Sequence, residues 1–155
     1  PGHRPVMGRR IRLATRGLVF NGDKLLLVNA WPDGKSDLMC APGGGAELHQ
    51  SLPDNLRREI YEETGLTVTV GPCVLINEFH DPHGDFHQVD IYFRCTLIAG
   101  ELSDTWKDVE NIVTDRRWVT RDELATLRVK PDSLASVAWD HVEHAAYDAL
   151  EPILR

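Results

Sequence analysis

The sequence predicts one domain of the mixed α/β class, and three observations lead to this prediction. The chain has 155 residues, the length of one ordinary domain with a sizeable core. Strand patterns and helix patterns alternate along it. Hydrophobic residues make up 42% and charged residues 26%, a balance that excludes disordered and disulfide-stapled classes. We expect residues 1–155 to form this domain, with residues 1–10 either flexible or left over from cloning.

The first part of the chain predicts a β-hairpin. Strand patterns over Arg12–Asn21 and Lys24–Asn29 flank an Asn-Gly turn, which is the strongest short hairpin signal. Residues 25–28 form an unbroken apolar run, typical of a strand covered on both faces. Residues 31–37 and the Pro-Gly-Gly-Gly run at 42–45 are predicted as loops.

A helix is predicted over residues 51–64. Ser51 suits the N-cap, Leu56 and Ile60 follow helical spacing, and Gly65 suits the residue after the last turn. The rest of the chain predicts further strands and helices around a histidine-rich loop at 80–87. The expected strands span 67–70, 74–80, 88–97 and 117–120, and the expected helices span 121–127 and 133–150.

Three acidic residues of the first helix carry the chemistry. Glu59, Glu62 and Glu63 are related as i, i+3 and i+4, so they project from one face. Like carboxylates repel one another, and a hard divalent cation such as Mg²⁺ or Mn²⁺ would offset them through oxygen ligands. The alternative is a solvated acidic face without a ligand. The glycines at 43–45 favour a site, because glycine lets the backbone approach a ligand closely.

The segment 44–66 resembles the Nudix box, a pattern of Gly, five residues, Glu, seven residues, then Arg-Glu-apolar-x-Glu-Glu-x-Gly-apolar. The residues in register are Gly44, Arg58, Glu59, Ile60, Glu62, Glu63, Gly65 and Leu66. Gln50 departs from the pattern, because it replaces the first glutamate and keeps a carbonyl acceptor without the charge. We expect this change to weaken metal binding or alter the loop, and the chemistry to be kept.

The resemblance implies the Nudix fold, a mixed β-sheet sandwiched between α-helices (α/β/α). It also implies a metal-dependent pyrophosphohydrolase of a nucleoside diphosphate linked to another group X, such as ADP-ribose, a nucleotide sugar or a (d)NTP. Such hydrolysis needs neutralised phosphate oxygens and a positioned water, which carboxylate-held Mg²⁺ or Mn²⁺ can supply. The small nucleotide-derived substrate would be the partner of the site.

The implied catalytic residues are Arg58, Glu59, Glu62 and Glu63. The three glutamates and the carbonyl of Gly44 would bind the metal, and Arg58 would hold a carboxylate in place by a charge-assisted hydrogen bond. The general base stays open. Glu59 or Glu63 could act from the helix, and the candidates on a distant loop are Glu101 and Glu110.

Several residues outside the carboxylates are candidates for substrate binding. They are Arg16 for a phosphate, Trp31 and Phe86 for stacking on a base, Gly43 and Gly45 for close backbone approach, and Pro82. In the family, a proline at about the position of Pro82 is associated with ADP-ribose pyrophosphatases. The histidine-rich loop could bind a borderline metal, contact a base, or be a plain polar hairpin.

Composition excludes some partners. A net charge of −7 argues against a nucleic-acid polymer, and apolar runs of four or five residues argue against a membrane span or a secretory signal. The three widely spaced cysteines predict reduced thiols and a cytoplasmic location. Trp106 and Trp139 are candidates for either the core or the surface of a homodimer.

Two other functions compete with hydrolysis. A non-hydrolytic Nudix-fold module that binds or regulates through a nucleotide gains support from Gln50, while the three glutamates argue against it. An isomerase acting on an isoprenoid diphosphate would need a reactive cysteine, for which Cys40 is loosely placed.

Overall fold

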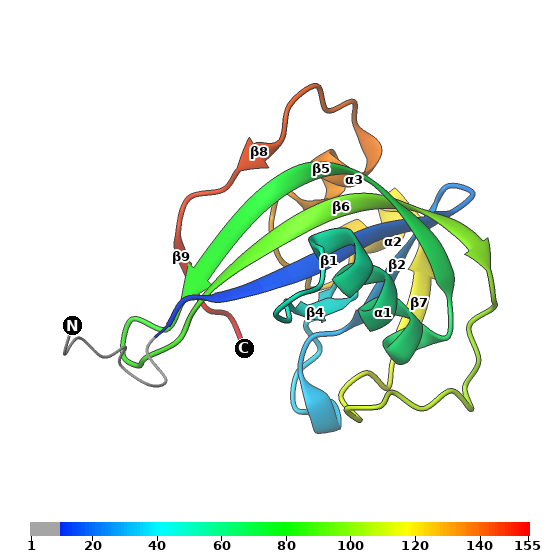
Figure 1. The fold of residues 1–155 in the computed structure, drawn as a ribbon, viewed down its shortest axis with the longest axis horizontal. Coiled ribbons are helices and arrows are strands. Elements are labelled where there is room, and N and C mark those ends of the chain that lie inside the picture. Colours follow the sequence, from blue (N-terminus) through cyan, green and yellow to red (C-terminus); the bar gives the residue numbers. More distant parts are fainter. Residues whose placement is uncertain (1–9) are drawn as a thin grey trace.

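A mixed β-sheet organises residues 10–155, which are the residues that the computed structural model describes (Figure 1). The expectation for the leading residues therefore lies outside the described residues, apart from Arg10. The main path of the sheet runs β3-β2-β1-β6-β5-β8, with β4 paired to β1, β7 to β2 and β9 to β5. The strands are β1 Arg12–Asn21, β2 Lys24–Asn29, β3 Met39–Cys40, β4 Gly43–Gly45, β5 Thr67–His80, β6 His87–Ala99, β7 Arg116–Val119, β8 Ala146–Tyr147 and β9 Glu151–Pro152.

Strand β1 is the branch point of the sheet. Along one side it pairs in parallel with β6, from Arg12 opposite Gln88 onwards. Along the other side its first half pairs with the glycine strand β4, and its last residues pair with β2 through the hairpin turn. The sheet therefore splits beside β1, and the split brings the backbone of Gly43–Gly45 to the middle of the molecule.

Helices cover both faces of the sheet, as Figure 1 shows. Helix α1 (Leu52–Thr64) lies on one face, and α2 (Arg121–Ala125) and α3 (Leu134–Trp139) lie on the other. Each face has its own apolar core. The core under α1 contains Val19, Leu26, Leu56, Ile60, Leu66, Val68, Phe93 and Cys95, while the opposite core includes Leu18, Leu25, Leu27, Leu75, Tyr92, Leu134 and Val137. This layering confirms the expected α/β/α arrangement.

The hairpin β1–β2 and helix α1 agree with the sequence predictions, and the apolar run of β2 is covered on both faces. Two strand predictions need correction. The strands expected at 67–70 and 74–80 are one strand, β5, which bends through irregular pairing around Cys73. The glycines predicted as a loop form β4, because the edge of β1 supplies hydrogen-bonding partners for their backbone.

The helix predicted over 133–150 is wrong beyond Trp139. The backbone becomes extended at Asp140, whose carboxylate pairs with Arg121 at 2.6 Å. The guanidinium of Arg94 donates to the carbonyl of Val137 at 2.8 Å and holds the end of the helix. The chain beyond this point forms β8 and β9, which pair in parallel with the outer edge of β5. An open strand edge supplies backbone partners, and these outcompete the helical pattern of the sequence.

In the described part of the chain, no helix has the length and apolar character needed to cross a membrane.

Candidate active site

Helix α1 has clear start and stop signals. The hydroxyl of Ser51 accepts the N–H of Asp54 at 3.1 Å, which caps the first turn. Gly65 takes a left-handed conformation with φ of 76°, and its N–H donates to the carbonyl of Tyr61 at 2.8 Å. Because Leu56 and Ile60 are fully buried against the sheet, the rotation of the helix is set, and its acidic face turns toward β4.

Two of the three helix carboxylates are buried against β4. Glu59 is 6% exposed and Glu63 is 7% exposed. A Cβ on Gly44 would lie 2.4 Å from Oε2 of Glu59, so only glycine leaves room for this carboxylate. The N–H of Gly43 donates to Oε1 of Glu63 at 3.3 Å. The carboxylates and the glycine backbone thus form one polar surface.

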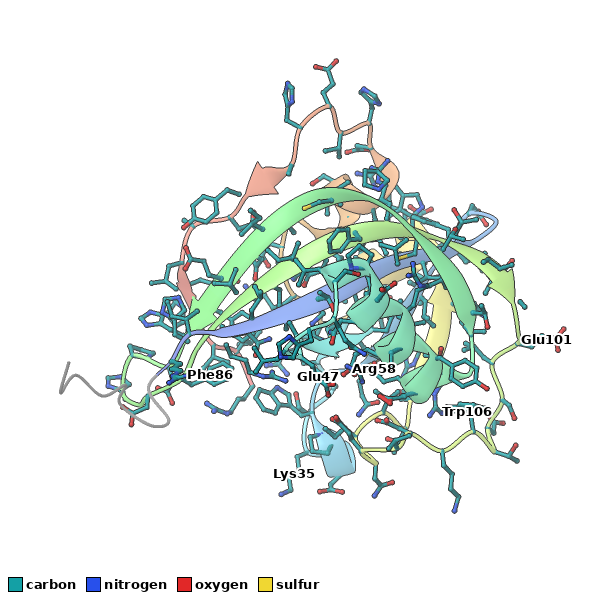
Figure 2. All side chains as sticks on the ribbon, viewed as in Figure 1. Lys35, Glu47, Arg58, Phe86, Glu101 and Trp106 are labelled. Carbon is teal, nitrogen blue, oxygen red and sulfur yellow. The ribbon has the colours of Figure 1, made fainter. Side chains whose placement is uncertain are left out.

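Arg58 provides the nearest positive charge on the helix. Its guanidinium donates to Oε1 of Glu59 at 3.2 Å and to Oε1 of Glu62 at 2.9 Å. It also donates to Oε1 of Gln50 at 3.2 Å, and it lies 3.6 Å from a carboxylate oxygen of Glu47. Figure 2 shows Arg58 and Glu47 next to each other beside α1. Gln50 therefore keeps the acceptor role that its amide oxygen allows, without a charge.

Asn55 ties the loop after β4 to the helix and the sheet. Its Nδ2 donates to the carbonyl of Gly45 at 3.1 Å and to the hydroxyl of Thr15 at 3.2 Å. Its Oδ1 accepts the N–H of Glu47 at 3.2 Å and Nη2 of Arg58 at 2.8 Å. This completely buried amide satisfies four groups at once, so it fixes the distance between β4 and α1.

The buried carboxylates are electrostatically unbalanced. Burial raises the pKa of Glu63 well above its ordinary value, against the opposing charge of Arg16. Burial also raises the pKa of Glu59; Arg58 opposes the shift, and the charges of Glu110 and Glu62 add to it. A bound cation would favour the charged form of both groups. The donor set of carboxylate and backbone oxygens therefore fits a hard divalent ion.

No three acidic, histidine or cysteine side chains within residues 10–155 already converge as a metal-binding group. Glu62 is engaged with Arg58, whereas Glu59 and Glu63 face β4. Of the residues expected to bind metal, the structure therefore brings Glu59, Glu63 and Gly44 together and leaves Glu62 at the side.

A cavity of about 360 Å³ opens on the other face of the sheet, where β1, β5 and β6 begin or end. Its wall includes four aromatic residues, several charged residues and part of the segment that follows β8. The aromatic residues are Trp31, Phe79, Phe86 and Tyr92, and the basic residues are Arg12, Arg16, Lys130 and Arg155. Aromatic rings beside cations suit a flat, anionic ligand.

A chain of buried polar groups forms the floor of this cavity. Arg12 donates to the amide oxygen of Gln88 at 2.6 Å, and Gln88 donates to Oδ1 of Asp90 at 2.7 Å. Nε of Arg16 lies 3.5 Å from Oδ2 of Asp90, and Nη1 of Arg16 donates to the carbonyl of Ala41 at 3.2 Å. Burial alone would lower the pKa of Arg16, but nearby Asp90, Cys40 and Glu63 raise it, so its charge is secure. Arg16 links the cavity to the buried carboxylates.

The predicted substrate residues divide into two groups. Arg16, Trp31 and Phe86 line the cavity, and Gly43 and Gly45 lie on β4 beside α1. Pro82 is exposed in the turn between β5 and β6 and does not line the cavity.

The histidine-rich loop closes the hairpin of β5 and β6. His87 contacts Glu78 at 2.9 Å, and the rings of His80 and His87 lie 5.9 Å apart. Within residues 10–155 these side chains form no metal-binding group, so the metal alternative for this loop is not supported.

The two candidates for a distant base are placed differently. The charge of Glu110 acts on Glu59, whereas Glu101 lies at the outer margin of the molecule in Figure 2. Sequence reasoning missed Gln88, Asp90, Asn55 and Asp108. Gln88 and Asp90 alternate on a predicted strand, so they could have been identified as polar groups on a covered face, but no sequence signal marked the other two.

Comparison with known proteins agrees with this arrangement of acidic helix, glycine strand and cavity. A family model described as the NUDIX domain matches residues 10–140, so the chain belongs to the Nudix family. The expected resemblance is confirmed.

Individual relatives are more distant. The ADP-ribose pyrophosphatase of Methanocaldococcus jannaschii is 31% identical over 102 residues, covering 63% of this chain and 59% of that protein. Diphosphoinositol polyphosphate phosphohydrolase 2 of Rattus norvegicus is 32% identical over 98 residues, covering 62% of this chain and 49% of that protein. The chain spans between about a third and three fifths of the length of the curated relatives it matches.

The fold also has solved counterparts. The crystal structure of an ADP-ribose pyrophosphatase from Streptococcus suis superposes with a TM-score of 0.66 at 22% identity. The match covers 90% of this chain and 100% of that one, so the fold is that of the Nudix family over most of the described residues.

Proposed function

We propose that this chain is a metal-dependent pyrophosphohydrolase that cleaves the diphosphate of a nucleoside diphosphate linked to a second group. One observation carries the proposal. Glu59 and Glu63 are buried against the backbone of Gly43 and Gly44, and Arg16 joins them to an aromatic cavity. The arrangement offers a place for a cation, a place for a phosphate and a place for a base, in that order.

Mg²⁺ or Mn²⁺ is the proposed cofactor. Glu59, Glu63 and the carbonyl of Gly44 would hold it, and Glu62 would join them only by releasing Arg58. When bound, the ion supplies neutralisation of the phosphate oxygens and activation of a water. Arg58 keeps Glu59 and Glu62 oriented, and Asn55 keeps β4 at the correct distance from α1.

Arg16 is the proposed contact for the phosphate nearest the nucleoside. Asp90 and Ala41 hold its guanidinium at the boundary between the cavity and the carboxylates. Trp31 and Phe86 are proposed to contact the base, together with Phe79 and Tyr92. Glycine at 43 and 45 leaves the β4 backbone open to the diphosphate.

Glu110 is the proposed general base among the loop candidates. It belongs to the segment before β7, and its charge acts on Glu59. A base must lie within reach of the water that it deprotonates, next to the metal ligands. Glu101 has no comparable link to the helix carboxylates.

The cavity favours a nucleotide over an inositol polyphosphate, the substrate named for the rat relative. Two of its cations face carboxylates in the same wall, because Arg16 faces Asp90 and Lys130 faces Glu151. A ligand with many phosphates needs many unpaired cations, whereas a stacked base with one diphosphate uses rings and a few charges. The names of the archaeal and streptococcal proteins make ADP-ribose the first substrate to try.

The competing functions lose their supporting observations. Gln50 suggested a non-hydrolytic module, but its amide oxygen accepts from Arg58, a role that needs no charge. An isomerase would need a reactive thiol, and burial raises the pKa of Cys40 to about 11.

We also propose a cytoplasmic location, supported by the three free thiols. Both tryptophans considered for a dimer surface pack within the chain, Trp106 against Tyr61 and Trp139 against Phe20. The homodimer stays a prediction.

The test is a substrate panel with Mg²⁺ or Mn²⁺ that contains ADP-ribose, a UDP-sugar, dNTPs and a dinucleoside polyphosphate. We expect turnover of at least one nucleotide, with cleavage between the phosphates identified by product analysis. Glu59→Gln should lower kcat by about 100-fold or more while the circular dichroism spectrum is unchanged. Saturable binding of a nucleotide without turnover of any would instead support the binding module.

A further inference from the structure

The segment between β6 and β7 is fastened at two points to the last turn of α1. Nε1 of Trp106 donates to the carbonyl of Glu62 at 2.9 Å, and Nε of Arg116 donates to the carbonyl of Glu63 at 2.6 Å. The last four carbonyls of a helix have no partner within the helix. Trp106 and Arg116 occupy two of them, so residues 107–115 begin and end at the helix that carries the acidic residues.

The first attachment depends on a glycine. The ring of Trp106 lies over Gly65, where a Cβ would be 2.9 Å from Cε3 of the indole. The ring also meets Tyr61 edge-on at a centroid distance of 5.3 Å. Figure 2 shows Trp106 beside the end of α1, on the side away from Phe86. The indole is therefore packed against the helix as well as hydrogen-bonded to it.

The carboxylate of Asp108 organises the segment between these attachments. Asp108 is 8% exposed, and its Oδ1 accepts the N–H of Glu110 at 3.2 Å. Its Oδ2 accepts the N–H groups of Ile112 and Val113 at 3.1 and 2.9 Å. Three backbone donors thus converge on one side chain, and the chain turns around it with Asn111 at a positive φ of 56°.

The far end of the segment is held by Asn29 of β2. Its Nδ2 donates to the carbonyl of Ile112 at 2.8 Å, and its Oδ1 accepts the N–H groups of Thr114 and Asp115 at 2.9 and 3.0 Å. Loops of this length without their own secondary structure are commonly mobile. Here side chains from α1, β2 and the segment itself satisfy its backbone.

We infer that Asp108 is a positioning residue that holds Glu110 against the Glu59 end of the acidic surface, an inference that rests on the proposed function. Its bond to the N–H of Glu110 acts one covalent step from the Cα of that residue. Displacement of a catalytic group by about 1 Å can cost 100-fold in rate, so holding this backbone in place matters for chemistry. The influence of Glu110 on the pKa of Glu59 agrees with this proximity.

A double-mutant cycle in kcat tests the inference. Glu110→Gln removes the candidate base and should lower kcat by about 100-fold, with KM changed less than about twofold. Asp108→Asn should lower kcat by about tenfold. If Asp108 acts through Glu110, the double variant should be no slower than Glu110→Gln alone. Additive losses, or a normal kcat for Glu110→Gln, would overturn the inference.

Two further variants separate position from charge and from folding. Asp108→Glu keeps the charge but displaces the carboxylate by one methylene, so kcat should fall as it does for Asp108→Asn; normal kcat would assign the effect to charge. Asp115→Asn is the matched control. Its carboxylate pairs with Arg117 in an exposed ion pair on the same segment, and kcat should be unchanged.

Hydrogen exchange provides a readout that does not need turnover. The backbone N–H groups of Glu110, Ile112 and Val113 should exchange at least about tenfold faster in Asp108→Asn and remain protected in Glu110→Gln. Unchanged protection in Asp108→Asn would refute the inference even if the enzyme is active. Faster exchange in a protein that hydrolyses nothing in the panel would refute the proposed function and leave the positioning role standing.

Discussion

At the scale of single residues, Glu63 shows the cost of preparing a metal site before the metal arrives. Its carboxylate is buried, its neighbour Glu59 is also acidic, and Arg16 compensates only in part. The raised pKa of Glu63 means that the folded protein binds a proton there more tightly than the unfolded chain does. Without metal, stability should therefore fall as pH rises from the ordinary glutamate pKa through the folded-state pKa of Glu63.

Glu63→Gln should remove this penalty. Glutamine keeps an oxygen that can accept the N–H of Gly43, and it carries no charge to bury. We expect the free energy of unfolding at pH 7.5 in EDTA to rise by about 1 kcal/mol, the equivalent of roughly one pKa unit, with little change at pH 4.5. Urea titrations at both pH values measure this, and the exposed Glu143→Gln serves as control. A loss of stability at pH 7.5 would contradict the account.

At the scale of elements, the decisive junction is the one between β4 and α1. The glycine strand makes few side-chain contacts of its own, so its position depends on hydrogen bonds from neighbouring elements. Asn55 provides two of them, directly to Gly45 and indirectly through Glu47. Thr15 of β1 shares the same amide, so one side chain joins the sheet, the strand and the helix.

Asn55→Ala should therefore loosen the junction. The change leaves buried polar partners unsatisfied, and we expect the free energy of unfolding to fall by about 2–3 kcal/mol. Mn²⁺ affinity, measured by calorimetry, should also fall, because β4 no longer holds its distance from Glu59. A variant with the stability and Mn²⁺ affinity of the wild type would show that water replaces the amide and that the junction does not depend on it.

At the scale of the whole molecule, the segment after α3 completes the cavity. Residues 140–155 run along the outer edge of β5, and β8 and β9 pair with it in parallel, as the orange and red ribbon in Figure 1 shows. Asp148 anchors this segment, because its Oδ2 accepts Nδ2 of Asn77 at 2.9 Å and the hydroxyl of Ser133 at 2.7 Å. Residues 151–155 then form part of the cavity wall.

Asp148→Ala should weaken nucleotide binding without affecting the chemical step. We expect KM to rise by about three- to tenfold at unchanged kcat, because the wall of the cavity becomes less ordered. The free energy of unfolding should fall by about 1–3 kcal/mol, since the buried amide of Asn77 loses its acceptor. Steady-state kinetics on the substrate found by the panel, with the exposed Asp23→Ala as control, measure the effect. A reduced kcat at normal KM would contradict it.

Much of the fold could be predicted because its signals are local. The Asn-Gly turn, the cap at Ser51 and the apolar spacing of Leu56 and Ile60 act within a few residues of chain. The helix predicted over 133–150 failed for the opposite reason. Its outcome was decided by the open edge of β5 and by Arg94 and Arg121, which lie far away in the sequence.

The candidate site divides in the same way. Arg58, Glu59, Glu62 and Glu63 could be found from sequence, because helical spacing puts acidic residues on one face and a fixed pattern surrounds them. Asn55, Asp90 and Asp108 carried no such signal. Their partners are backbone groups or side chains on other elements, and a buried polar residue differs from an exposed one only after folding.

By itself, the sequence determined the family, the acidic helix and the kind of cation that its oxygens would accept, because these depend on residue type and on spacing along one helix. Only the tertiary structure decided that Glu62 turns to Arg58 while Glu59 and Glu63 face the glycine strand. It also brought Glu110 rather than Glu101 toward the acidic surface and opened the cavity beside Arg16. Those outcomes follow from hydrogen bonds and packing between residues far apart in the chain, which no local pattern encodes.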